Sequence, residues 1–146
     1  MTVIDYPGIR HLLLAQNIAP VKFVISDAEY NLPSKKWVLN EFSDSLLSCL
    51  KFLDVDEFKA ENNDCDDFAR LAACLAQILH HRTSPEIKTG LAIGEFWYRF
   101  DSGGGHAINF IIYLDETPKI MFFEPQTQKE VFLSETEKQS CSFWRL

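Results

Sequence analysis

A chain of 146 residues has the length of one domain, and a domain of this size can hold a core without a disulfide or a metal. Hydrophobic residues make up 47% of the chain and charged residues 24%, as in an ordinary globular protein. The net charge of −7, with no basic stretch to offset it, disfavours phosphate backbones and anionic membrane surfaces as partners. We therefore expect a single domain over residues 1–146 that binds neither nucleic acid nor membrane.

The cysteines and the first residues bear on the compartment in which the chain works. The four cysteines are far apart and form no C-x-x-C pair, which argues against a zinc or redox motif and favours free thiols in a reducing compartment. The chain does not begin with a basic start and a long apolar stretch, and no run approaches the ~18 apolar residues of a membrane span. The sequence therefore predicts a cytoplasmic protein without a signal peptide or transmembrane segment.

The first half of the chain is predicted to contain one strand and two helices. The strand is the β-branched and aromatic run Val21–Ile25. The first helix opens at Pro33-Ser34 and continues to Leu53, because its apolar residues recur every three to four positions. The second helix follows Asn62-Asn63-Asp64, any of which can cap it, and ends near His80-His81.

The second half of the chain is predicted to form strands that are separated by glycine, proline and aspartate turns. The strands are expected at Leu91–Phe100, Ala107–Leu114, Lys119–Phe123 and Glu130–Leu133, with Ser142–Leu146 as a candidate for a last one. Helices followed by antiparallel strands are typical of the α+β class. We therefore expect an α+β domain in which a central helix packs on an antiparallel sheet.

Three residues occupy positions that suit thiol chemistry. Cys65 lies in the first turn of the second helix, where free N–H groups and the helix dipole lower the pKa of a thiol. His106 opens a strand after three glycines, and Glu124 ends the following strand, so neighbouring antiparallel strands would place them side by side. A nucleophile, a base and an orienting carboxylate are the parts of a thiol enzyme, so we predict a catalytic trio.

The sequence around each member of this trio resembles one family. Asn63–Ala69 reads Asn-Asp-Cys-Asp-Asp-Phe-Ala, Gly105–Asn109 reads Gly-His-Ala-Ile-Asn, and Phe122–Thr127 reads Phe-Phe-Glu-Pro-Gln-Thr. These motifs resemble those of the papain-like (transglutaminase-like) cysteine peptidases, and most closely the C-terminal domain of the calcium-dependent mushroom agglutinins and related small phage and bacterial proteins. The resemblance covers roughly residues 60–130 and implies a papain-like fold with a protein or peptide substrate. It does not extend to the sugar-binding domain of the agglutinins.

The resemblance also implies a calcium site beside the thiol. The candidate ligands are Asp66, Asp67, Asn109 and Gln126, whose carboxylate and amide oxygens suit Ca²⁺. Asp64, Asp66 and Asp67 oppose ionisation of the thiol, and a bound calcium ion would reverse that local field. We therefore expect calcium to activate Cys65. The structural alternative is that these carboxylates only cap the helix and favour its positive end.

Two classes of function follow from these residues. In the first, the chain is a cysteine peptidase-type hydrolase in which Cys65 attacks a carbonyl, His106 acts as base and then acid, and Glu124 orients the imidazole. A transglutaminase, deamidase or amidase would use the same trio, although peptidoglycan amidases usually carry Ser-Gly where this chain has Asp66-Asp67. In the second, the domain is a calcium-binding or protein-interaction module with little or no turnover. A domain without any site is a third possibility, and the sequence leaves the substrate and oligomeric state open.

Overall fold

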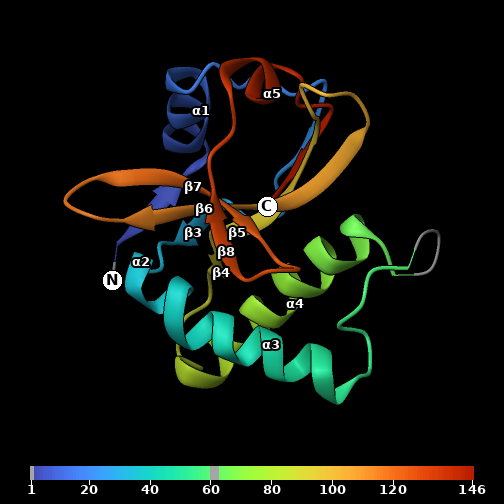
Figure 1. Cartoon of the computed structure of the whole chain (residues 1–146). Coiled ribbons are helices and arrows are strands. Elements are labelled where there is room, and N and C mark those ends of the chain that lie inside the picture. The colour runs from blue at the N-terminus through green and yellow to red at the C-terminus, as the bar shows by residue number, and fades with distance from the viewer. Residues whose placement is uncertain (1, 60–62) are drawn as a thin grey trace.

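The computed structural model describes residues 2–59 and 63–146, with helices above and below a central sheet (Figure 1). The helices are α1 Tyr6–Ala15, α2 Lys35–Trp37, the π-helical segment η1 Val38–Phe42, α3 Ser43–Phe52, α4 Cys65–Thr83 and α5 Glu135–Gln139. The strands are β1 Val3–Asp5, β2 Lys22–Val24, β3 Glu29–Asn31, β4 Gly90–Leu91, β5 Ile93–Arg99, β6 Gly105–Leu114, β7 Pro118–Glu124, β8 Lys129–Val131 and β9 Phe143–Arg145. Short strands therefore occur in both halves of the chain.

The larger sheet has six strands in the order β2-β9-β5-β6-β7-β8. Neighbours from β9 to β8 are antiparallel, whereas β2 pairs with β9 in parallel, so the sheet is mixed. Strands β1, β3 and β4 form a second sheet in which β3 and β4 are parallel. Gly94 in β5 permits a close approach, because a Cβ built there would lie 1.8 Å from the carbonyl oxygen of Arg145.

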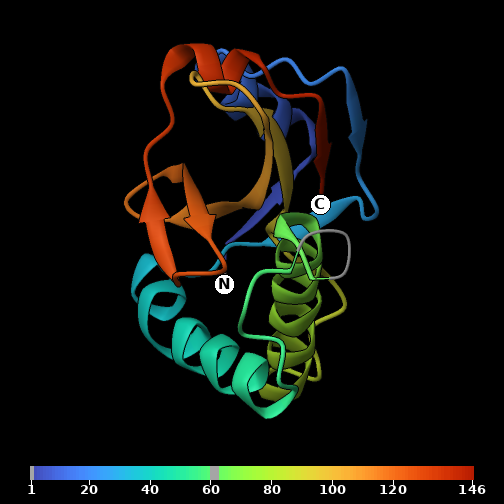
Figure 2. The same ribbon diagram turned by 45° about the vertical axis from the view of Figure 1, so that its right-hand side comes forward.

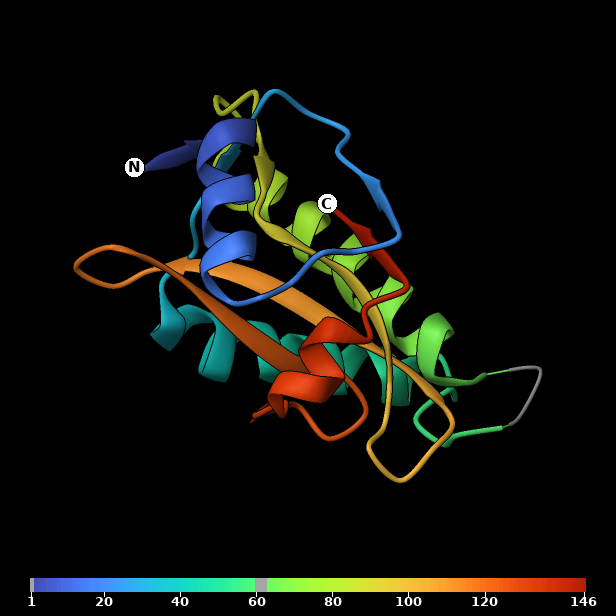
Figure 3. The same cartoon turned by 90° about the horizontal axis from the view of Figure 1, so that it is seen from above.

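Both faces of the large sheet are buried, because the side chains along each strand point alternately to one face and to the other. Phe96, Phe110 and Phe122 point to one face and pack with residues of α1. Ile111 and Phe123 point to the other face and pack with residues of η1, α3 and α4. Figure 2 shows the sheet between these two helical layers, and Figure 3 shows α1 lying across it from above. A sheet covered on both faces holds the two ends of its strands in fixed positions.

Helix α4 packs directly on the central strands β5 and β6. Phe68, Ala72 and Ala76 form its buried stripe, and the two alanines allow a close approach to the sheet. Asp64 is the N-cap residue, although its side chain makes no capping hydrogen bond. Asn63 instead donates from its side-chain amide to the carbonyl oxygens of Val55 and Glu57, which holds the preceding loop against the start of α4. Asn62, the other candidate cap, lies outside the described residues.

Most of the longer elements appear where the sequence predicts them. The first predicted helix is continuous through α2, η1 and α3, with Ser34 as its N-cap, and α4 ends at Thr83, close to the expected His80-His81. Helices α1 and α5 and strands β1, β3 and β4 were not predicted from the sequence. The missed strands have two or three residues, which is too short for periodicity to identify.

The predicted fold class, an α+β papain-like fold with a central helix on one antiparallel sheet, is wrong for this chain. Strands β1, β2 and β3 precede the long helices, the large sheet is mixed, and a second sheet lies beside it. The physical reason is that the pairing of β2 with β9 joins residues from opposite ends of the chain. Such non-local pairing is decided by tertiary contacts rather than by local sequence patterns.

Candidate functional site

His106 and Glu124 meet at one end of the large sheet, where β6 begins and β7 ends. The Nε2 atom of His106 lies 2.7 Å from Oε2 of Glu124, so the ring N–H donates to the carboxylate. The other oxygen, Oε1, accepts a hydrogen bond of 3.1 Å from the backbone N–H of Gln126. Both side chains of the pair are only 14% exposed. The expectation that these two residues lie side by side is confirmed.

Aromatic rings and a glycine turn fix the position of the imidazole. The ring of Phe100 stacks on His106 with centroids 4.9 Å apart, and Tyr98 meets it edge-on at 5.8 Å. The turn before β6 contains Gly103 and Gly104 with φ of 94° and 90°, a backbone conformation that favours glycine. Phe100 is 39% exposed, so one wall of the site is an aromatic side chain at the surface.

Cys65 is the first residue of α4, and its half-buried thiol accepts from the backbone of Ala107, the residue after His106. Burial raises the pKa of the Cys65 thiol, and the charges of Asp64 and Asp66 raise it further. The expectation that the helix start lowers this pKa is therefore wrong, because burial and the neighbouring carboxylates outweigh it. Within the described residues no hydrogen bond joins the sulfur to the ring of His106.

The carboxylates beside Cys65 are arranged around Arg70. Arg70 lies one turn further along α4, and its guanidinium is 2.9 Å from the carboxylate of Asp66 and 3.5 Å from that of Asp67. A hydrogen bond with Asp64 and the guanidinium of Arg70 lower the pKa of Asp66, whereas the same bond and repulsion from Asp66 raise the pKa of Asp64. Arg70 therefore supplies the positive charge that the sequence analysis assigned to a calcium ion.

The four candidate calcium ligands are not all brought together. Asp66 and Asp67 lie on the first turn of α4, and Asn109 reaches this helix by donating from Nδ2 to the carbonyl oxygen of Ala69 at 2.8 Å. Gln126 contacts Glu124 instead. No group of three acidic, histidine or cysteine side chains suited to a metal occurs in residues 2–59 and 63–146. The donor set is nevertheless of the oxygen type that Ca²⁺ takes, and Oδ1 of Asn109 is a buried acceptor without a partner among these residues.

Glu95, a buried carboxylate beside these residues, was not among the site residues predicted from the sequence. Its side chain is 3% exposed and lies 4.0 Å from Arg70 and 3.8 Å from Arg145. Trp97 donates a hydrogen bond to this carboxylate from its indole nitrogen at 3.3 Å. The signal was a glutamate between the hydrophobic residues Ile93 and Phe96 of β5, since a glutamate in such a place is rarely buried unless it is paired.

Known structures share this fold, although no model of a known protein family and no curated protein matches the sequence. One such structure is described as the complex of PSL1a with E-64, with a TM-score of 0.65 and 20% identity. Another is the lectin of Polyporus squamosus bound to the human-type influenza-binding epitope Neu5Acα2-6Galβ1-4GlcNAc, with a TM-score of 0.68 and 21% identity. The alignments cover 97% of this chain but 49% and 48% of those chains, so it spans about half their length.

These neighbours correct the expected family and function. The predicted relationship to papain-like cysteine peptidase domains is wrong: the fold is shared with about half of the PSL1a chain and about half of the Polyporus squamosus lectin chain. The expected hydrolase function, together with its description as a cysteine protease, is corrected as well, because the neighbours are described by the ligands they bind and not by hydrolysis. The motifs around Cys65, His106 and Glu124 define a local arrangement, and a local arrangement does not fix how a fold is used.

Across the described part of the chain, no helix combines the length and the apolar character needed to cross a bilayer.

Proposed function

We propose that this chain is a ligand-binding module and that its ligand contacts Cys65, His106 and Glu124 at the start of α4. The observation that carries the proposal is the shared fold with two chains, one of them described as a lectin, that are each described in complex with a ligand. The chain spans about half of those proteins, so the transfer of a binding role to it is part of the proposal.

The geometry of the cluster supports binding. His106 and Glu124 form a fixed, partly buried polar pair, and the exposed ring of Phe100 provides an apolar wall beside it. A few fixed polar groups next to aromatic side chains are typical of small-molecule sites. The raised pKa of Cys65 keeps its thiol neutral near pH 7, so the sulfur offers a weak hydrogen-bonding group rather than a charge.

A glycan is the first ligand class to test. Sugar hydroxyls can donate to the carboxylate of Glu124, and the apolar face of a sugar ring can lie on Phe100. The Polyporus squamosus lectin is described with a glycan that contains Neu5Ac, and this trisaccharide is therefore the first probe. A second candidate is E-64, because PSL1a is described in complex with it.

Calcium is included in the proposal as a cofactor of glycan binding. Asp66, Asp67 and the unpartnered Oδ1 of Asn109 would hold it, after Arg70 leaves the two aspartates. A bound Ca²⁺ would supply positive charge beside the site. The carboxylate of Neu5Ac would be attracted to that charge, whereas the acidic chain alone repels it.

Titration calorimetry on the whole chain tests the proposal. The trisaccharide and E-64 are each titrated in excess Ca²⁺ and again in EGTA. The variant Glu124→Gln removes the charge that holds His106, and Glu116→Gln is the matched control at an exposed position outside the site. We expect the loss of a charge-assisted hydrogen bond to weaken binding by about tenfold in Glu124→Gln, with no change in the control.

Two results would overturn the proposal. The first is the absence of binding heat with both ligands in either buffer. The second is equal affinity of Glu124→Gln and the unmodified chain, which would place the ligand elsewhere. Peptide mapping by tandem mass spectrometry after the E-64 titration locates any covalent adduct, and an adduct on Cys74 instead of Cys65 would count against this site.

A further inference from the structure

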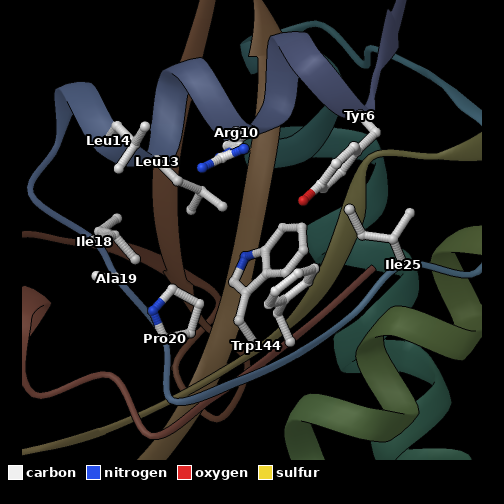
Figure 4. Close-up of a pocket in the computed structure, with 10 residues that line it drawn as sticks. Tyr6, Arg10, Leu13, Leu14, Ile18, Ala19, Pro20, Ile25 and Trp144 are labelled. Atoms are coloured by element: carbon white, nitrogen blue, oxygen red, sulfur yellow. The ribbon is translucent and has the colours of Figure 1, made fainter.

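A second cavity lies between α1 and the paired strands β2 and β9, and we call it the α1 pocket (Figure 4). Its volume is about 180 Å³, and most of its lining is aliphatic or aromatic, including Leu13, Ile18, Phe23 and Trp144. None of Cys65, His106 and Glu124 lines it. An apolar cavity of about 150 Å³ is large enough to hold benzene, so the α1 pocket has room for a small molecule.

Trp144 gives the pocket a polar group that lacks a partner. Its side chain is fully buried, and its Nε1–H has no hydrogen-bond acceptor among the residues that the structure describes. Buried donors in native proteins are nearly always paired, so an unpaired one calls for an explanation. In Figure 4 the indole nitrogen is turned toward the side of the pocket that α1 covers.

Arg10 adds a positive charge on the same side. It is exposed on α1, and the ion pairs found in residues 2–59 and 63–146 do not include it. Figure 4 shows its guanidinium on the α1 side of the pocket, which Tyr6 and Trp144 also line. A guanidinium and an indole N–H that line the same pocket suit an oxyanion, because both groups donate hydrogen bonds.

We propose that the α1 pocket binds a small carboxylate with a short aliphatic body. The carboxylate accepts hydrogen bonds from Arg10 and from the Nε1–H of Trp144, and the aliphatic body lies against Leu13, Ile18 and Phe23. A cavity of about 150 Å³ holds the six carbon atoms of benzene, so the 180 Å³ volume admits an aliphatic body of five carbon atoms, with the carboxylate at the side that Arg10 lines. Hexanoate, with its short chain, is therefore the probe that we would use first.

The test follows the indole N–H resonance of Trp144 in the whole, ¹⁵N-labelled chain, assigned with Trp144→Phe. Hexanoate, hexan-1-ol and hexylamine have similar bodies but negative, neutral and positive head groups. We expect millimolar hexanoate to shift this resonance to saturation, hexan-1-ol to bind about tenfold more weakly, and hexylamine to bind least. Decanoate, which is too long for the pocket, is expected to bind more weakly than hexanoate if the ligand is a free small carboxylate.

Arg10→Met keeps much of the apolar stem of Arg10 but removes the charge, and Arg82→Met is the matched control near the end of α4. We expect Arg10→Met to reduce hexanoate affinity about tenfold without changing that for hexan-1-ol, and Arg82→Met to change neither. An unmoved Trp144 resonance with hexanoate would overturn the proposal. Equal affinities for hexanoate and hexan-1-ol, or an unchanged affinity in Arg10→Met, would also overturn it, because the head group would then not be recognised.

Discussion

Gly94→Ala tests how the C-terminal strand is held. A Cβ at position 94 would lie 1.8 Å from the carbonyl oxygen of Arg145, 2.8 Å from its carbonyl carbon and 3.0 Å from the Cα of Leu146. Ordinary van der Waals contact begins near 3.4 Å, so the backbone of β9 must retreat by about 1.6 Å. All three of these atoms belong to the main chain of Arg145 and Leu146, so rotation of a side chain cannot relieve the clash.

The expected loss of stability depends on how far β9 retreats. A shift that keeps its pairing with β5 is overpacking, which costs about 1–3 kcal/mol. If β9 detaches, Trp144 leaves the core, and roughly 150–250 Å² of aromatic surface at about 25 cal/mol per Å² corresponds to about 4–6 kcal/mol. We therefore expect Gly94→Ala to lower the free energy of unfolding by about 1–6 kcal/mol, with the upper part of this range if the strand is released.

Urea-induced unfolding measures this change, and the Trp144 indole resonance reports whether β9 stays paired. Gly105→Ala is the control, because its Cβ would have only one neighbour, at 4.0 Å, and its effect should stay within about 0.5 kcal/mol. A loss below about 0.5 kcal/mol in Gly94→Ala would refute the reasoning, since it would mean that β9 is not held against Gly94 as described.

Two further predictions concern the thiol and a helix cap. Burial and neighbouring carboxylates raise the pKa of Cys65. At neutral pH its alkylation by iodoacetamide should therefore be slower than that of the exposed Cys74, and it should accelerate only in the alkaline range. Faster alkylation of Cys65 than of Cys74 at neutral pH would contradict this. Ser134 and Glu137 form a capping box at α5. Ser134→Ala should therefore lower the free energy of unfolding, measured by urea denaturation, by about 1 kcal/mol, whereas Ser48→Ala on the exposed face of α3 should leave it nearly unchanged. Equal effects of the two substitutions would argue against the cap.

The cluster of Cys65, His106 and Glu124 and the α1 pocket differ in chemical character and in position. The cluster at the start of α4 combines polar side chains from one helix and two strands, and it carries the proposed function. The α1 pocket is mostly apolar and shares no lining residue with that cluster. A ligand for either site can therefore be tested without occupying the other.

The sequence alone determined the elements that have a strong local signal. Helix α4 follows from the period of Phe68, Ala72 and Ala76, and the hairpin of β6 and β7 follows from two apolar runs joined by a turn. The neighbourhood of His106 and Glu124 could be predicted as well, because it requires only that two adjacent strands pair.

Tertiary structure decided the rest, because the deciding contacts join residues that are far apart in the chain. The pairing of β2 with β9 made the sheet mixed, and the packing of α4 on β5 brought Arg70 to 4.0 Å from the buried carboxylate of Glu95. The Cys65 thiol shows the same effect: its helix position favours a thiolate, but packing against the sheet removes it from water and raises its pKa. The burial of the Cys65 thiol depends on the whole fold, so the direction of its pKa shift could not be predicted from the local sequence pattern.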